Sequence, residues 1–182
     1  NAVIGMVTRL TGQKGLDLVM EVLEEILNMN LQMVVLGTGD WKYENGLQEI
    51  AKRYSNKLSV IINFSKDIAS KIYAGSDMFL MPSKFEPCGL SQLIAMRYGS
   101  LPIVRETGGL KDTVMPYNPQ TQKGTGFTFK TYDAYDMLDA IKRALALYQD
   151  KDKWQNLIKN AMEKDYSWKE QAKKYIEMYK NL

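Results

Sequence analysis

The 182-residue sequence contains no histidine and only one cysteine, Cys88. Histidine and cysteine are the commonest protein ligands of zinc and iron, so we expect no metal site. A single cysteine also excludes a disulfide within the chain. Because histidine is the commonest acid–base residue near neutral pH, any chemistry must rely on other side chains.

The sequence also lacks a long apolar run and a strong excess of charge of one sign. No stretch approaches the roughly 20 apolar residues that cross a bilayer, and no secretory leader is recognisable. The 24 basic and 21 acidic residues give a net charge of +3, spread too evenly to predict a nucleic-acid surface. With 45% hydrophobic residues, the sequence predicts one globular, cytoplasmic domain that binds neither nucleic acid nor a membrane.

Six short apolar runs alternate with amphipathic stretches through most of the chain. The runs, each predicted to be a strand, lie at residues 3–8, 32–37, 58–63, 78–82, 101–105 and 126–129. Between them apolar residues recur at helical spacing, as in residues 16–27 and 47–54. Strands that are apolar on both faces and alternate with helices predict an α/β fold, with a doubly wound parallel sheet covered on both sides.

After residue 129 the pattern indicates helices only. The last helix begins near Trp168 and carries a stripe of large aromatic side chains, for which packing on this domain and packing on a missing one are both open. At the other end, Asn1 leads directly into an apolar strand, without a methionine start or a polar leader. We therefore expect the chain to be an excised segment of a longer protein.

Charged residues and glycines follow the first two strands, at the edge where open parallel sheets bind ligands. Arg9 and Lys14 precede a helix, whose free N–H groups and positive dipole end would help them to bind a diphosphate. A solvated turn with two surface cations is the alternative. The Gly37–Gly39 turn lacks the third glycine of a dinucleotide fingerprint, since Lys42 stands there, and this argues against NAD binding.

The strongest signal is the loop that follows the fourth strand. Glu86 is flanked by a phenylalanine and a proline, and its carboxylate can accept hydrogen bonds from sugar hydroxyls. The N–H groups of Cys88, Gly89 and Leu90 come next, at a helix start, where they can donate to hydroxyl or phosphate oxygens. A charge that merely satisfies the helix dipole is the weaker interpretation of Glu86.

Two further features follow neighbouring strands. Phe64, after the third strand, could stack on a base, although on its own it is better interpreted as a cover for the edge of the core. Gly108 and Gly109, after the fifth strand, would let several N–H groups converge on an anion, with a plain turn as the alternative. Because these features share one edge of the sheet with the two cations and Glu86, they predict a single binding site.

Three motifs make the sequence resemble the glycogen and starch synthases, a family of retaining glucosyltransferases. They are Thr8-Arg9-Leu10 with Gln13-Lys14-Gly15-Leu16-Asp17-Leu18, Phe85-Glu86-Pro87-Cys88-Gly89-Leu90, and Thr107-Gly108-Gly109-Leu110. Tyr166-Ser167-Trp168 also resembles the aromatic-Ser-Trp that opens the last helix in that family. The resemblance covers essentially the whole chain and implies the C-terminal one of two Rossmann-like domains that face each other across a cleft, the GT-B architecture.

In this interpretation residues 1–182 form one C-terminal domain, with the sheet and its helices in 1–149 and terminal helices in 150–182. The N-terminal half, which in the family supplies a Lys-x-Gly-Gly loop and a histidine beside the sugar, is absent from the sequence. Broader relatives of the same architecture often carry a second glutamate eight positions after the first. Ile94 stands there, which favours the synthases.

The resemblance also implies a role for each motif residue. Arg9 and Lys14 hold the diphosphate of ADP-glucose, Phe64 lies against the adenine, and Glu86 faces the glucose hydroxyls. Further contacts with the sugar, the nucleotide and the phosphates are implied for Cys88, Gly89, Leu90, Ser91, Thr107, Gly108, Gly109 and Leu110.

The implied reaction transfers glucose from ADP-glucose to the non-reducing end of an α-1,4-glucan with retention, and needs neither a cofactor nor a metal. Arg9, Lys14 and helix amides would offset the charge of the leaving diphosphate. Another GT-B enzyme that uses UDP-glucose is one alternative. A receiver-like regulatory domain is a second, but it needs acidic residues where Arg9 and Phe64 stand.

Overall fold

The strands form where the apolar runs predict them, each ending within one residue of its expected bounds. The computed structural model describes residues 1–181, apart from the side chain of Lys174. The strands are β1 (Ala2–Val7), β2 (Leu31–Gly37), β3 (Leu58–Ile62), β4 (Met78–Met81), β5 (Leu101–Arg105) and β6 (Phe127–Phe129). They make one parallel sheet in the order β3-β2-β1-β4-β5-β6.

This strand order decides where loops can meet. The chain builds outward from β1 to β3 and then returns to add β4 on the other side of β1. Because all strands are parallel, their carboxyl ends share one edge, and β1 and β4 mark the point where the order of strands reverses, which is where such folds bind ligands. The two loops with the strongest sequence signals, which carry Lys14 and Glu86, follow these two strands.

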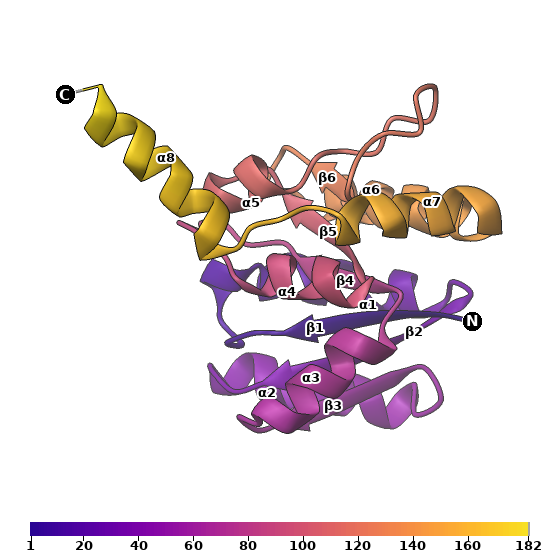
Figure 1. Cartoon of the computed structure of the whole chain (residues 1–182). Coiled ribbons are helices and arrows are strands. Elements are labelled where there is room, and N and C mark those ends of the chain that lie inside the picture. Colours follow the sequence, from indigo (N-terminus) through magenta and orange to yellow (C-terminus); the bar gives the residue numbers. More distant parts are fainter. Residues whose placement is uncertain (182) are drawn as a thin grey trace.

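Helices cover both faces of the sheet (Figure 1). They are η1 (Gly12–Lys14), α1 (Leu16–Leu27), α2 (Trp41–Arg53), α3 (Lys66–Gly75), α4 (Ser91–Tyr98), α5 (Gly108–Thr113), α6 (Ala134–Tyr148), α7 (Lys151–Met162) and α8 (Trp168–Lys180). The largest apolar cluster lies between the sheet and α1, α2 and α6, whereas smaller clusters lie beneath α3, α4 and α5. The doubly wound α/β prediction is therefore confirmed. Within the described residues, no helix has the length and apolarity needed to span a membrane.

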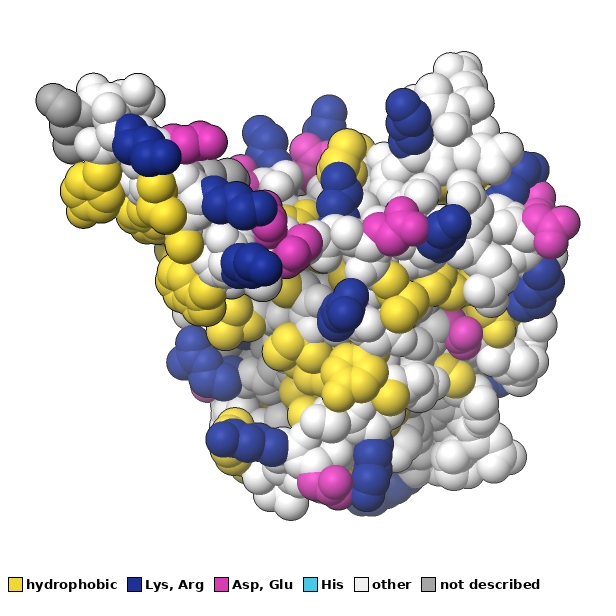
Figure 2. Space-filling model, viewed as in Figure 1, with side chains coloured by type: hydrophobic (Ala, Val, Ile, Leu, Met, Phe, Trp, Pro, Cys, Tyr) yellow, Lys and Arg dark blue, Asp and Glu magenta, His cyan; other side chains and the backbone are white. Residues whose placement is uncertain are grey.

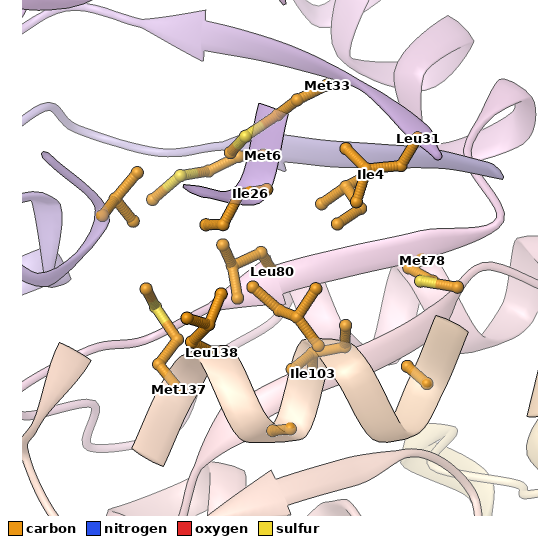
Figure 3. Close-up of a cluster of buried hydrophobic side chains, with 14 of the residues drawn as sticks. Ile4, Met6, Ile26, Leu31, Met33, Met78, Leu80, Ile103, Met137 and Leu138 are labelled. Atoms are coloured by element: carbon orange, nitrogen blue, oxygen red, sulfur yellow. The ribbon is translucent and has the colours of Figure 1, made fainter. Parts of the chain in front are cut away.

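The main core is made largely of aliphatic and sulfur-containing side chains, contributed by strands and by the helices that cover them. Figure 3 shows Ile4 and Met6 of β1, Leu80 of β4, and Met137 and Leu138 of α6 meeting in one interior cluster. All five side chains are buried. Full burial of one such side chain contributes about 1.5–3 kcal/mol, so this layer holds the carboxyl edge of the sheet in a fixed position.

The two glycines at the end of β2, Gly37 and Gly39, let two backbones pass closely. A Cβ on Gly37 would collide with the carbonyl oxygen of Thr8, and one on Gly39 with that of Leu10. Leu10 and Gly39 instead form an isolated parallel bridge, and the Asp40 amide donates to the Leu10 carbonyl at 2.8 Å. This contact continues the pairing of β1 and β2 and fixes the start of the loop that carries Lys14.

The terminal helix α8 projects from the body of the molecule (Figure 1). Its aromatic stripe faces solvent: Trp168 is 82% exposed and Tyr179 69% exposed. Hydrophobic side chains gather along one side of this helix in Figure 2. Of the two packing arrangements that the sequence left open, packing on this domain is therefore not the one adopted.

Candidate functional site

The loops after β1 and β4 are joined through their backbones. Gly15 has a φ of +80°, and a Cβ there would collide with the carbonyl of Pro82. The amide of Lys84 donates to the carbonyl oxygen of Gln13 at 2.9 Å. Only glycine permits this approach without strain, so the sequence itself determines how closely the two loops can lie.

Lys14 and Glu86 form an ion pair across the junction between these loops. The distance from Lys14 Nζ to Glu86 Oε2 is 2.5 Å, and the two side chains are only 17% and 11% exposed. Ser83 Oγ donates to the same carboxylate oxygen at 3.2 Å. Removing either charge would leave the other poorly solvated and unpaired. The structure therefore brings the residue expected at the phosphates into direct contact with the one expected at the sugar.

Arg105, at the end of β5, holds the backbone that leads into Glu86. Its guanidinium donates to the carbonyl oxygens of Ser83 at 3.0 Å and of Lys84 at 2.5 Å. A third contact reaches the carbonyl of Lys130, just after β6, at 3.4 Å. The fork of N–H donors on arginine suits such convergent carbonyls. Arg105 is expected at a strand end from the sequence, but no role is predicted for it, because carbonyl acceptors leave no side-chain pattern.

The start of α4 presents backbone donors, as predicted. Cys88 and Leu90 are exposed and Gly89 is half-buried. Within residues 1–181, the amides of these three residues have no hydrogen-bond acceptor. The buried side chain of Gln92 donates instead to the carbonyls of Cys88 and Gly89, at 3.1 and 2.8 Å. The loop is thus held by its carbonyls while its N–H groups stay available.

In the turn after β5, more backbone amides are already hydrogen-bonded within the protein than expected. The amide of Gly109 donates to the Glu86 carbonyl at 3.0 Å, that of Leu110 to the Thr107 carbonyl at 3.1 Å, and that of Thr107 to the last residue of β5 at 2.9 Å. The Leu110 side chain is buried. Of the four predicted donors, only Gly108 has no acceptor for its amide within the described residues. The turn therefore fixes the Glu86 loop and offers one amide, rather than several.

A pocket of about 310 Å³ lies farther along the same edge, at the carboxyl ends of β1, β2 and β3. Arg9, Phe64 and Tyr73 are among its lining residues. Phe64 is 82% exposed, so the interpretation of this ring as a cover for the core is wrong. The Tyr73 hydroxyl donates to Ser91 Oγ at 3.0 Å, which links the pocket to the start of α4.

The two cations after β1 are divided between two parts of the site. Arg9 is exposed and lines the pocket with Phe64, whereas Lys14 lies beside Glu86. The sequence treats them as a pair because they are five positions apart. The short helix η1, which ends at Lys14, turns the chain between them. The spacing of the charges in the sequence does not reveal this turn.

Most of the chain matches a known protein family. A family model described as "Glycosyl transferases group 1" matches residues 1–164. The chain is 55% identical over 180 residues to the glycogen synthase of Anoxybacillus flavithermus, and 58% identical over 179 residues to that of Lactobacillus acidophilus. These alignments cover 99% and 98% of this chain but 37% and 38% of the relatives. The chain thus spans little more than a third of their length.

Solved structures give the same result. The catalytic domain of Starch Synthase IV from Arabidopsis thaliana, bound to ADP and acarbose, superposes with a TM-score of 0.90 and 37% identity, over 100% of this chain and 38% of that one. A sucrose-phosphate synthase from Thermosynechococcus elongatus, at 23% identity and a TM-score of 0.75 over 99% of this chain and 45% of that one, shares the fold. This chain is therefore a member of the group 1 glycosyl transferases, with the fold of a C-terminal GT-B domain.

Proposed function

We propose that this chain is the nucleotide-sugar-binding domain of a glycogen or starch synthase, which transfers glucose from ADP-glucose to the non-reducing end of an α-1,4-glucan with retention. The observation that carries the proposal is the Lys14–Glu86 pair, joined at 2.5 Å at the carboxyl edge of the sheet. It sets a cation suited to phosphate beside a carboxylate suited to sugar hydroxyls. The identity of 55% to a glycogen synthase supports the choice of reaction.

In this proposal Lys14 and Glu86 act on adjacent parts of one ligand. The Glu86 oxygen Oε2 is occupied by Lys14 and Ser83, which leaves Oε1 to accept from glucose hydroxyls. The Lys14 ammonium has three N–H donors, so it can keep its bond to Glu86 while it donates to the diphosphate. Such a preformed donor stabilises the charge that develops on the leaving group without reorganising during the reaction.

Backbone donors complete the part of the site that we assign to sugar and phosphate. The three amides of Cys88, Gly89 and Leu90 precede α4, and the positive end of that helix favours an anion. Gly108 adds the one amide of its turn that has no acceptor within residues 1–181. These groups and Lys14 would balance the diphosphate without a metal ion.

The pocket beside Phe64 is assigned to the adenine ring. An exposed phenylalanine offers a flat apolar face on which a base can stack, and Arg9 in the same pocket can reach the phosphates. Ser91, bonded to Tyr73, lies between this pocket and the amides of α4 and would contact the ribose or the adjoining phosphate. In this arrangement the base and the sugar lie at opposite ends of the site along the carboxyl edge of the sheet.

The proposal includes an opposing N-terminal domain, so that residues 1–182 form only one wall of the active site. The exposed aromatic stripe of α8, with Trp168 82% exposed, supports a further packing partner. That second wall would orient the glucan and exclude water. Positioning two reactants is worth roughly 7–11 kcal/mol of barrier lowering, so this chain alone should bind nucleotide yet transfer no glucose. Its cytoplasmic location stays a prediction.

Calorimetry and a transfer assay together test the proposal. The 182-residue chain is titrated with ADP and assayed for incorporation of labelled glucose from ADP-glucose into glycogen, alone and joined to a glycogen synthase N-terminal domain. We expect ADP binding in both forms and transfer only in the joined form. Glucan elongation by the chain alone, or no ADP binding at millimolar concentration, would contradict the proposal. A larger thermal shift with UDP than with ADP would instead assign a UDP-glucose enzyme.

A further inference from the structure

Tyr132, which lies outside every sequence motif, contacts both of the loops that carry the ion pair. Tyr132 lies between β6 and α6 and is half-buried. Its neighbours come from the loop after β1, from the loop after β4 and from the end of β5. None of the roles proposed above involves it, and it lies outside the family motifs of the sequence.

The hydroxyl of Tyr132 is bonded to both sides of Lys14 along the chain. It lies 2.6 Å from Asp17 Oδ1 and 3.0 Å from the carbonyl oxygen of Gly12. The single hydroxyl proton can be donated to either acceptor at a time, so the same tyrosine oxygen holds both acceptors near it. Burial, followed by the hydrogen bond to Asp17, raises the pKa of Tyr132. The phenol therefore stays protonated and remains a donor throughout the physiological range.

The ring of Tyr132 contacts the other half of the junction. The guanidinium carbon of Arg105 lies 5.4 Å from the ring centroid, and Lys84 Nζ lies 5.5 Å from it. Both distances are within the range of cation–π attraction. Arg105 holds the carbonyls of Ser83 and Lys84, and the amide of Lys84 donates to the loop of Lys14. One residue thus contacts the backbone supports of both members of the ion pair.

We propose that Tyr132 is a positioning residue that holds the Lys14 loop and the Glu86 loop in register, so that the ion pair is preformed for the diphosphate and sugar of the ligand. The proposal rests on the nucleotide-sugar function assigned above. Tyr132 does not touch the ligand. It acts through Lys14, by fixing Gly12 and Asp17 on one side of the junction and the cations of Lys84 and Arg105 on the other.

Tyr132→Phe is the main test, because it removes the hydroxyl and keeps the ring beneath the two cations. In the 182-residue chain we expect ADP affinity to fall about fivefold, the effect of one net hydrogen bond, with a thermal midpoint within about 4 °C of the parent. The matched control is Tyr135→Phe. Tyr135 donates to Glu25 Oε1 on α1 at 3.3 Å, so it joins α6 to α1 at a place away from the ion pair. Its loss should leave ADP affinity unchanged.

A double-mutant cycle separates positioning from a general structural role. If Tyr132 acts through Lys14, Tyr132→Phe should cause no further loss of ADP affinity in a Lys14→Ala background, because coupled residues are not additive. The same fivefold loss in both backgrounds would overturn the proposal. So would an equal loss of ADP affinity in Tyr135→Phe.

Amide hydrogen exchange tests the same role without any ligand. The Lys84 amide, which donates to Gln13 at 2.9 Å, should exchange about fivefold faster in Tyr132→Phe than in Tyr135→Phe, since opening free energy sets the exchange rate. Unchanged exchange at Lys84 would overturn the role of Tyr132 even if ADP binds. Failure of the parent chain to bind ADP would reject the proposed function, while faster exchange would still support the positioning of the two loops.

Discussion

The two parts of the candidate site are built in opposite ways. Taken as whole residues, Phe64 in the pocket is 82% exposed, whereas Glu86 beside Lys14 is 8% exposed. Among the described residues, the Arg9 side chain in the pocket makes no hydrogen bond or ion pair, but Lys14 and Glu86 are bonded to each other. A flat apolar ring needs no support to receive a base. Charges that act on a leaving group are most effective when they are held in place beforehand.

The order of strands explains why supporting contacts surround the ion pair but not the pocket beside Phe64. The ion pair lies where the order of strands reverses between β1 and β4, so that loops from both halves of the sheet meet there. Arg105 at the end of β5 and Tyr132 after β6 contact the loops of the ion pair. Gly15 allows these two loops to lie close together. The pocket lies over β1, β2 and β3, on one half of the sheet, where fewer loops converge.

Gly15→Ala should have the largest effect on the difference between the ion pair and the pocket, because it disturbs only the ion-pair loops. The substitution places a Cβ against the Pro82 carbonyl at a φ of +80°, which forces the two loops apart. We expect unfolding free energy to fall by about 3 kcal/mol in urea denaturation, as for strained backbone positions. Gly75→Ala is the matched control, since a Cβ there meets nothing within 4 Å. Equal stability of the two variants would show that the loops are not held by this approach.

Lys14→Ala should come next. We expect ADP affinity to fall at least tenfold, consistent with about 1.5–3 kcal/mol for a hydrogen bond to a charged group. The unfolding free energy should also fall, because Glu86 is left as a largely buried carboxylate without its cation. Calorimetry with ADP and urea denaturation measure the two effects. Unchanged ADP affinity would remove Lys14 from the site.

Phe64→Ala should weaken ADP binding without changing stability. Stacking on one base is worth about 1–3 kcal/mol in nucleic-acid sites, the nearest available scale. Phe64 is 82% exposed, so the thermal midpoint should stay within error of the parent. Inorganic pyrophosphate, which has no base, should bind as before. An equal loss for both ligands would mean that Phe64 shapes the site rather than contacting adenine.

Lys71→Ala should have the smallest effect and sets a baseline for ion pairs on this chain. Lys71 and Asp67 are 2.8 Å apart on α3, with side chains 74% and 76% exposed. Exposed pairs are screened by water, so we expect a change in unfolding free energy within about 0.5 kcal/mol. A loss as large as that of Lys14→Ala would show that burial does not distinguish the two pairs.

Sequence patterns predicted the strands well, because strands depend on local signals, and the same signals place the candidate site at one edge of the sheet. Apolar runs give strands, and residues after strands must lie at the carboxyl edge. The exposure of Phe64 could not be predicted in this way, since an aromatic in a loop is compatible with either stacking or burial. Tyr132 was missed although it follows the last strand. Its place after β6, at the same edge of the sheet, is the signal in the sequence that points to it.

The sequence by itself determined the order of elements, the glycines that allow close approach, and the motifs that resemble a glycosyltransferase family. Only the tertiary structure decided that Lys14 meets Glu86 and that Tyr132 meets Asp17, since these partners are 72 and 115 residues apart. The reason is physical. Local patterns specify each strand and helix, but which loops become neighbours depends on the order of strands in the sheet, which is fixed by packing of the whole chain.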